Sequence, residues 1–310
     1  MRLLVTGGAG FIGSHFVDRF VSEGHQVWVL DNLRSGSKAN LHPEATFLHL
    51  DLKDERLAQQ VGALRPDAVF HLAAQIDVRI SCADPVFDAT ENILATLRLI
   101  EAGLASGMTF FGFASSGGAI YGEAAVPQSE AHPEQPMNPY GVAKLSVDKY
   151  LHAYAIQRGL RSASLRFSNV YGPRQGAKGE AGVVAVFAKM LRDGRPPRIH
   201  GDGLQTRDFV FAPDLAEAAS LILRKQATGV FNLGTGIETT ILDLAKGLCA
   251  AAKVDSGRIE HGEAIPGEQR RSVLDPAKAT RELGWQPRMP LAEGLKVTYD
   301  WFVAHRQEEA

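Results

Sequence analysis

Thr6-Gly7-Gly8-Ala9-Gly10-Phe11-Ile12-Gly13 decides the fold, because it joins a short apolar run to a helical pattern. Its glycines follow the spacing Gly8-x-Gly10-x-x-Gly13. Such glycines allow a tight turn, let the backbone approach a pyrophosphate and let the helix pack closely on the sheet. The first turn of the helix offers unpaired N–H groups to the phosphates. The stretch predicts a dinucleotide-binding turn, although glycines at this spacing can also serve a purely structural turn.

Asp31 ends the second apolar run, about 20 residues after the glycine turn, where dinucleotide-binding folds carry an acid. Its carboxylate can accept hydrogen bonds from the adenosine ribose and would repel a 2′-phosphate. The alternative is that Asp31 only caps a turn. Its place favours NAD over NADP, so we predict NAD as the cofactor.

Short β-branched runs alternate with helical patterns through the first half of the chain. The apolar runs lie at residues 3–6, 26–30, 46–50, 67–73, 108–115 and 162–168, and helical patterns follow at 11–24, from about 54, after Pro85 and after Pro139. Near-continuous apolar strands are typical of a parallel sheet buried on both faces. We therefore predict a Rossmann-type, doubly wound parallel α/β sheet.

From about residue 169 the pattern loosens, and Gly and Pro become frequent. This change predicts a smaller C-terminal α/β domain that binds the substrate. Residues 207–228 again contain a strand pattern and then a helical one, so they are expected to return to the sheet domain. We assign 1–168 and about 205–228 to the NAD-binding domain, and about 169–204 and 229–310 to the substrate-binding domain.

The composition is that of an ordinary globular protein, with 45% hydrophobic residues and a net charge of −2. This balance gives no electrostatic signal for nucleic acid or an anionic membrane. The first apolar run is too short for a secretion signal or a spanning helix. Cys82 and Cys249 form no CxxC pair, which predicts two buried free thiols, and the histidines show no metal-ligand spacing. We expect a cytoplasmic enzyme with no metal, membrane or nucleic-acid partner.

A candidate catalytic pair opens the helical pattern after Pro139. Tyr140 and Lys144 are four residues apart and so share one helix face. A free tyrosine has a pKa of about 10, and lowering that pKa to near 7 needs about 4 kcal/mol of preference for the phenolate. The Lys144 ammonium and a positive nicotinamide ring can supply this preference, which makes Tyr140 a usable base. Tyr-x-x-x-Lys alone is common on helix surfaces, so the interpretation depends on the dinucleotide turn and on the serines that end the fifth run.

Together these motifs resemble the extended short-chain dehydrogenase/reductase family, within it the NAD-dependent epimerases and dehydratases, and most closely the UDP-glucose 4-epimerases. The likeness covers nearly the whole chain. It is carried further by Asp31-Asn32, Asp51-Leu52, His71-Leu72-Ala73-Ala74, Asn92, Ser115-Ser116, Tyr121-Gly122, Arg166-Phe167-Ser168-Asn169, Tyr171-Gly172-Pro173-Arg174, Gly201-Asp202-Gly203, Arg207-Asp208-Phe209 and Pro266-Gly267-Glu268. The resemblance implies that Tyr140 removes the proton of the sugar 4-hydroxyl while NAD takes the C4 hydride, and that the hydride returns to the other face of a 4-keto sugar. Because NAD is restored, it is expected to stay tightly bound.

The resemblance also implies the site residues. The catalytic ones are Ser116, Tyr140 and Lys144. Those expected at the NAD are Gly7, Gly10, Phe11, Ile12, Gly13, Asp31, Asn32, Ser35, Gly36, Asp51, Leu52, Leu72, Ala73, Ala74, Gln75, Asn92, Ser115, Tyr140, Lys144 and Phe167. Those expected at the diphosphate of a UDP-sugar are Asn169, Val183, Val184, Arg207, Arg270 and Arg271. Arg207 could equally pair with Asp208, and the two valines could equally be core residues.

A homodimer is expected through the helices near 85–105 and 139–157. Both patterns carry apolar residues on more than one face, and such faces must be buried somewhere. Members of the resembled family pair through these helices.

Three positions depart from the family pattern. The usual Ser or Thr, four residues before Tyr121, is Gly117 here, so we assign its role to Ser116, with Ser115 as the competitor. An Arg that commonly precedes the Pro-Gly-Glu motif is Ile265, for which Arg270 or Arg271 is expected to substitute. A bulky residue of the sugar pocket is Ser272, which leaves room for a 2-acetamido group.

Four other functions stay open. The enzyme could epimerise another UDP-sugar, such as UDP-N-acetylglucosamine or UDP-glucuronate. A sugar-nucleotide dehydratase would carry Asp-Glu, an acid and a base, where this chain has Gly118-Ala119. This chain therefore has no titratable group at those two positions. A ketoreductase would need to exchange its cofactor freely. A non-catalytic NAD-sensing protein would have no use for Tyr140 and Lys144.

Overall fold

A computed structural model describes residues 1–176, 182–265, 267 and 269–305 of the chain. Its centre is a seven-stranded sheet in the order β11-β6-β5-β4-β1-β2-β3, and every neighbouring pair is parallel. The strands are β1 (Arg2–Thr6), β2 (Gln26–Asp31), β3 (Thr46–His49), β4 (Ala68–His71), β5 (Phe110–Ser116), β6 (Arg161–Phe167) and β11 (Gly229–Leu233). The predicted doubly wound α/β fold is confirmed.

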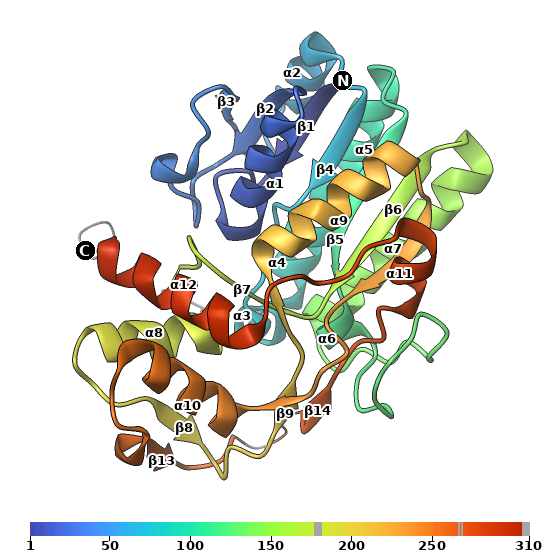
Figure 1. Cartoon of the computed structure of the whole chain (residues 1–310). Helices are drawn as coiled ribbons and strands as arrows, with labels where there is room; N and C mark the ends of the chain where they lie inside the picture. Colours follow the sequence, from blue (N-terminus) through green and yellow to red (C-terminus); the bar gives the residue numbers. More distant parts are fainter. Residues whose placement is uncertain (177–181, 266, 268, 306–310) are drawn as a thin grey trace.

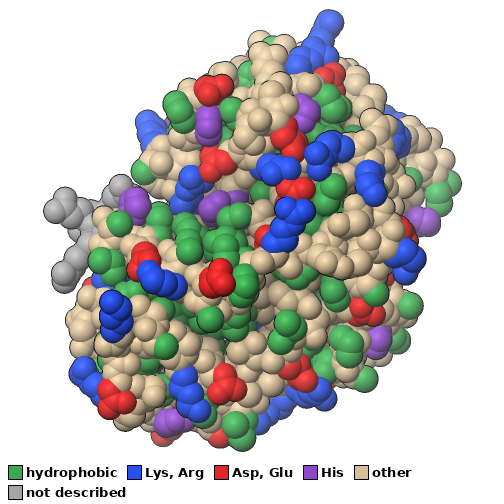
Figure 2. Space-filling model, viewed as in Figure 1, with side chains coloured by type: hydrophobic (Ala, Val, Ile, Leu, Met, Phe, Trp, Pro, Cys, Tyr) green, Lys and Arg blue, Asp and Glu red, His purple; other side chains and the backbone are tan. Residues whose placement is uncertain are grey.

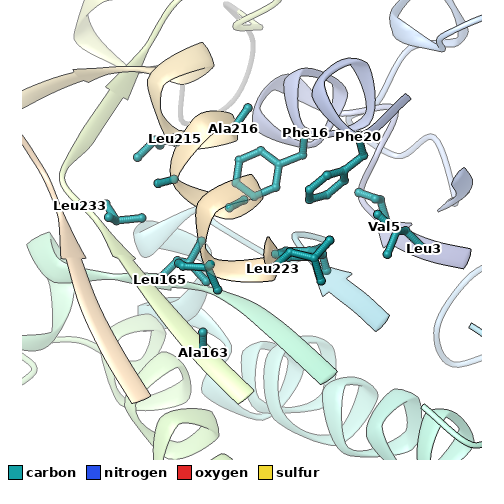
Figure 3. Close-up of a cluster of buried hydrophobic side chains, with 14 of the residues drawn as sticks. Leu3, Val5, Phe16, Phe20, Ala163, Leu165, Leu215, Ala216, Leu223 and Leu233 are labelled. Carbon is teal, nitrogen blue, oxygen red and sulfur yellow. The ribbon is translucent and has the colours of Figure 1, made fainter. Parts of the chain in front are cut away.

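Helices cover both faces of the sheet (Figure 1). One face is covered by α1 (Phe11–Ser22), α9 (Ala212–Lys225) and α11 (Ala277–Leu283), and the other by α2 (Leu57–Leu64), α5 (Ala95–Ala105) and α7 (Pro139–Arg158). On the first face Phe16 and Phe20 of α1 pack beside α9 and above β1 and β6 (Figure 3). Burial on both faces explains why these strands are apolar nearly throughout.

The helix expected after Pro139 is present, and its ends have clear causes. Asn138 accepts a hydrogen bond from the Gly141 backbone N–H at 2.8 Å, and Pro139 occupies the first turn, where no N–H is needed. At the other end Gly159 takes a left-handed conformation with φ 67°. The helix expected after Pro85 is also present. It consists of α4 (Pro85–Ala89), a π-helical turn η2 (Thr90–Leu94) and α5.

The smaller domain lies beside the carboxyl ends of the central strands (Figure 1). Its helices are α8 (Val183–Arg192), α10 (Ile241–Ala252) and α12 (Leu291–Ala304), which share one apolar core. Its short strands are β7 (Asn169–Tyr171), β8 (Arg198–His200), β9 (Thr206–Arg207), β10 (Phe209–Phe211), β12 (Thr239–Thr240), β13 (Glu260–Gly262) and β14 (Arg271–Ser272). The other short helices of the described residues are η1 (Lys38–Asn40), α3 (Val78–Ala83), α6 (Gly117–Ile120) and η3 (Ser256–Arg258).

Three details of the sequence analysis need correction. Residues 229–233, assigned to the substrate domain, form β11 and pair with β6, because α9 carries the chain back across the sheet. The strand pattern before α9 is β10, which pairs with β7 outside the seven-stranded sheet. Cys82 is exposed on the short helix α3, whereas Cys249 is buried as expected.

Acidic and basic side chains are interspersed over the face shown in Figure 2, as the small net charge leads one to expect. Within the described ranges, no helix combines the length and the apolar character that crossing a membrane requires. Nor do those ranges bring together three or more His, Cys, Asp or Glu side chains in a way that could hold a metal ion.

Candidate active site

The glycine turn between β1 and α1 leaves no room for side chains at two positions. A Cβ on Gly7 would lie 2.6 Å from the Ala73 nitrogen, and Gly7 has φ 68°. A Cβ on Gly13 would overlap the carbonyl oxygen of Gly7. Close main-chain packing therefore keeps the turn free of side chains, and it forms a cradle at the amino end of α1, where a pyrophosphate is stabilised. These residues fit a dinucleotide.

Asp31 ties the glycine turn to the loop after β2. Its carboxylate accepts hydrogen bonds from the backbone N–H of Ala9 at 3.1 Å and of Leu33 at 2.8 Å. Asp31 thus caps a turn, which is the alternative role that the sequence analysis left open for it. The carboxylate lies at the carboxyl edge of the sheet, the place predicted for the adenosine ribose.

The loops around that edge bring more of the predicted cofactor residues together. The Asn32 side-chain amide donates to Asp51 at 2.8 Å, so the loops after β2 and β3 are joined. Gly36 packs directly against Ala9, leaving 3.1 Å for an added Cβ. The Arg34 guanidinium lies 5.1 Å from the centre of the Phe87 ring on α4. This last contact links the loop after β2 to helix α4 and was not foreseen from the sequence.

Lys144 is buried on α7, with 4% of its surface exposed. Its ammonium donates to the Ala114 carbonyl oxygen at 2.9 Å and lies 4.8 Å from the centre of the Phe113 ring and 5.7 Å from that of Tyr140. Burial lowers the pKa of Lys144 to about 8, against the charges of Asp148 and Asp88, which favour the ammonium form. The structure thus places the cation beside the Tyr140 ring, as the shared helix face predicts.

A buried ionic network supports this helix from behind. Arg166 of β6 donates to Asp148 of α7 at 3.0 and 2.8 Å, to the Tyr121 hydroxyl at 2.8 Å and to Glu134. Tyr121 in turn donates to Asn232 of β11 at 2.8 Å. The network fixes α7 against the end of the sheet that carries the site. Its sequence signals were an arginine inside the apolar run 162–168 and the motif residue Tyr121, but neither indicated that the two side chains meet.

The two serines at the end of β5 lie in different surroundings. Ser115 is buried beside Asp148; burial raises the pKa of that carboxyl group, and the Ser115 hydroxyl opposes the rise. Ser116 is half-buried at the start of α6, and strand alternation turns it to the other face. A Cβ at Gly117 would overlap the Leu274 side chain, so the residue usual in the family cannot fit here unless Leu274 moves. Assignment of the hydroxyl to Ser116 stays a prediction.

The smaller domain gathers the predicted substrate residues less completely. Asn169 on β7 lies close to Arg207 on β9, because the Asn169 backbone N–H donates to the carbonyl of Asp208, the next residue after Arg207, at 2.9 Å. Arg271 is held by Glu238 through two hydrogen bonds of 2.7 Å, and Arg270 lies 3.4 Å from Asp202. Ile265 is exposed.

The valine pair at the start of α8 matches the core-packing alternative. Val184 is buried and Val183 partly buried in the smaller domain's core. Their backbone N–H groups nevertheless open α8 immediately after Gly182. Pro266 and Glu268 of the predicted motif lie outside the described residues.

A sequence profile described as the NAD dependent epimerase/dehydratase family matches residues 3–234. The chain belongs to this family. The UDP-glucose 4-epimerase of Mycolicibacterium smegmatis is 42% identical over 309 residues, which cover 97% of this chain and 98% of the relative. The Thermotoga maritima UDP-glucose 4-epimerase, solved with UDP-glucose, has a TM-score of 0.95 at 43% identity and covers 99% of this chain and 100% of its own. The Thermus thermophilus UDP-glucose 4-epimerase, solved with NAD, has a TM-score of 0.92 at 40% identity, with 98% and 100% covered.

Membership in this NAD-dependent family accounts for the cradle at Gly7 and Gly13 and for the loops that surround it. His71, which the sequence analysis treated only as part of a motif, ends β4. Burial lowers its pKa to about 3, and its ring lies between Thr6 at 2.6 Å and Thr96 at 2.8 Å. His71 is therefore a neutral link between β1 and α5 and not an acid or base.

Proposed function

We propose that this protein is a UDP-sugar 4-epimerase that inverts C4 of UDP-glucose and UDP-galactose. The observation that carries the proposal is the buried Lys144 ammonium beside Tyr140, at the edge of the sheet where the glycine cradle opens. The family membership and the names of its relatives support the same reaction.

In the proposed mechanism Tyr140 removes the proton of the sugar 4-hydroxyl and later returns it. Lys144 stabilises the Tyr140 phenolate by its charge, and Ser116 donates a hydrogen bond to the reacting oxygen. When bound, NAD would supply reversible hydride transfer at C4. The glycine cradle, Asp31 and the Asn32–Asp51 link would hold the cofactor, while Asn169 and Arg207 orient the diphosphate so that the sugar alone turns.

The deciding experiment is incubation of the purified protein with UDP-glucose, UDP-galactose and their 2-acetamido counterparts, without added NAD. Proton NMR should show inversion at C4 only, and denaturation should release about one NAD per chain. Loss of water from the sugar would instead identify a dehydratase. Accumulation of reduced cofactor would identify a ketoreductase. If none of the UDP-sugars reacted although NAD was bound, the protein would be a non-catalytic NAD sensor.

We further infer that the enzyme is a cytoplasmic homodimer. Both cysteines are free, which supports a reducing compartment. Helices α3 to α7 present exposed apolar side chains, including Val86 (75% exposed), Leu94 (53%) and Ile156 (72%). Such a surface supports pairing of two copies through these helices. Light scattering should give twice the chain mass, and Leu94→Glu with Ile156→Glu should give monomers; a monomeric wild type at micromolar concentration would contradict the inference.

A further inference from the structure

Leu274 is a fully buried side chain of the segment after β14, and it packs on the turn that follows Ser116. A Cβ on Gly117 would lie 2.5 and 2.6 Å from the two methyl carbons of Leu274 and 3.1 Å from its Cγ. Gly117 begins α6 and its φ is not positive, so any residue could adopt its backbone conformation. Space, and not conformation, therefore keeps position 117 free of a side chain.

Hydrogen bonds from two other elements hold the backbone of this segment. The Leu274 N–H donates to the buried carboxylate of Asp208, between β9 and β10, at 3.3 Å. From the loop after α6, the Gln128 N–H donates to the Val273 carbonyl and the Gln128 carbonyl accepts from the Asp275 N–H, each at 2.8 Å. Buried polar groups are costly to leave without partners. The segment is therefore expected to stay in place when a larger side chain is introduced at position 117.

The Leu274 side chain also has little room to turn aside. Gly234, which follows β11, lies against it as well, because a Cβ there would be 3.1 Å from the Leu274 Cβ and would overlap the Asp208 carboxylate. Since none of the leucine surface is exposed, a different rotamer has to displace neighbours in a close-packed interior. Two glycines from separate elements thus make the space that one leucine fills.

The turn that Leu274 covers leads directly to the proposed base. The Ala119 carbonyl oxygen lies so close to Gly141, the neighbour of Tyr140, that no Cβ would fit there. Main chain thus packs on main chain between α6 and the first turn of α7. Ser116 is the residue before α6, and its hydroxyl does not cap that helix. Ser116 therefore carries the last side chain before two glycines, and the helix leaves its hydroxyl to other partners.

We propose that Leu274 is a positioning residue, which takes the space of the family's hydroxyl at position 117 and so makes Ser116 the donor to the sugar oxygen. This proposal rests on the proposed epimerase function, because the hydroxyl serves that reaction. Leu274 acts through the turn and not on the reacting atoms. The proposal predicts that a hydroxyl at position 117 can replace that of Ser116 only when residue 274 is smaller.

Thermal unfolding of NAD-loaded variants tests the exclusion without any substrate. Gly117→Ser should lower the unfolding midpoint by about 5 °C in the wild type, because it overfills a packed site. In the Leu274→Ala background the same substitution should lower it by about 1 °C or less, since the space is then open. The matched control is Gly118→Ser, where a Cβ would meet the Ser272 hydroxyl at an ordinary 3.7 Å. Its cost should be the same in both backgrounds.

A milder variant accompanies Leu274→Ala, which leaves a cavity and is itself destabilising. Leu274→Val removes the two methyl carbons nearest to Gly117 and keeps most of the packing. It should reduce the cost of Gly117→Ser by about half. An equal cost of Gly117→Ser with leucine, valine and alanine at position 274 would overturn the proposal.

Turnover shows whether position 117 can take over from Ser116. In the wild type, Ser116→Ala should lower kcat about a hundredfold. In the double variant Gly117→Ser with Leu274→Ala, it should lower kcat about threefold or less, because a second hydroxyl then lies at the turn. A leucine that only filled the core would leave the dependence on Ser116 unchanged. A hundredfold loss in both backgrounds therefore overturns the positioning role.

The two readouts keep this proposal apart from the proposed function. A wild type that inverts no UDP-sugar at C4 refutes the epimerase and the donor role with it, while the unfolding midpoints still decide whether Leu274 closes position 117. If the enzyme epimerises but Gly117→Ser costs the same in every background, Leu274 has no such role and the epimerase stands.

Discussion

The two domains hold their polar groups in different ways. Around the glycine turn, polar contacts join loops from successive strands, as when Asn32 binds Asp51 and Asp31 binds Ala9. In the smaller domain, two of the arginines expected at the phosphates bind carboxylates, Arg270 with Asp202 and Arg271 with Glu238. The first arrangement is preorganised around a groove. The second requires that charged side chains change partners or that other groups bind the substrate.

The sharpest way to test the preorganised half is Tyr140→Phe. The ring is retained for packing, while the only proposed base is lost. We expect turnover to fall by about a thousandfold, within the usual range for general acid–base groups, with NAD still bound. Coupled assay of UDP-galactose formation measures the loss, and released NAD is the control for cofactor retention. A variant with wild-type turnover would remove Tyr140 from the mechanism.

The next largest effect is expected at the end of β5. Ser116→Ala should lower turnover by about a hundredfold, as loss of an oxyanion-type donor does. Ser115 is turned to the opposite face, beside Asp148, so Ser115→Ala should cost clearly less activity.

Steady-state kinetics of the two serine variants, side by side, decide the assignment. Greater damage at Ser115 would reverse it. If neither substitution mattered, Tyr140 would act without a close hydroxyl, and the departure at Gly117 would be a true loss of the family's group.

The cofactor half was largely predictable because its signals are backbone signals. Gly7 and Gly13 are fixed by close approach of main chains, and the parallel strands by continuous apolar runs, so neighbouring residues carry the information. The Tyr140–Lys144 face follows likewise from helix geometry. The choice of NAD over NADP as the cofactor needed only the position of Asp31 along the chain.

The remaining features depend on contacts between distant segments. Arg166 meets Asp148 and Tyr121 only because β6, α7 and α6 converge. Leu274 excludes a side chain at Gly117 from the far end of the chain. Strand β11 was misassigned because its partner β6 lies more than sixty residues earlier. The prediction that Cys82 is buried was wrong for the same reason, because the exposure of a short helix depends on tertiary contacts.

The third prediction tests whether the smaller domain binds phosphate through Arg207 or Arg271. Arg207→Gln should raise the KM for the UDP-sugar by tenfold to a hundredfold, since a hydrogen bond to a charged group contributes about 1.5–3 kcal/mol. Arg271→Gln is the matched control. Arg271 is held by Glu238 in an exposed pair, so its loss should change KM by about twofold or less. The reverse ranking would show that Arg271 leaves Glu238 to replace the arginine missing at Ile265.

The smallest effect concerns the sugar pocket, where Ser272 stands in place of a bulky residue. Ser272 is buried in β14 beside Arg207, and its hydroxyl lies 3.7 Å from where a Cβ on Gly118 would be. Its side chain therefore lies over the turn that follows Ser116, so a larger group there would narrow the sugar end of the site. We expect the wild type to accept UDP-N-acetylglucosamine beside UDP-glucose.

Ser272→Tyr should lower kcat/KM for the acetamido sugar about tenfold more than for UDP-glucose, a modest ratio typical of discrimination by pocket size. Ser272→Ala, which keeps the space and removes only the hydroxyl, should leave the ratio of the two substrates unchanged. Competition between both sugars in one NMR tube measures that ratio directly. Equal loss on both substrates would mean that the tyrosine disturbs the turn at Gly118 and not the pocket. The specificity of the smaller domain would then depend on residues other than Ser272.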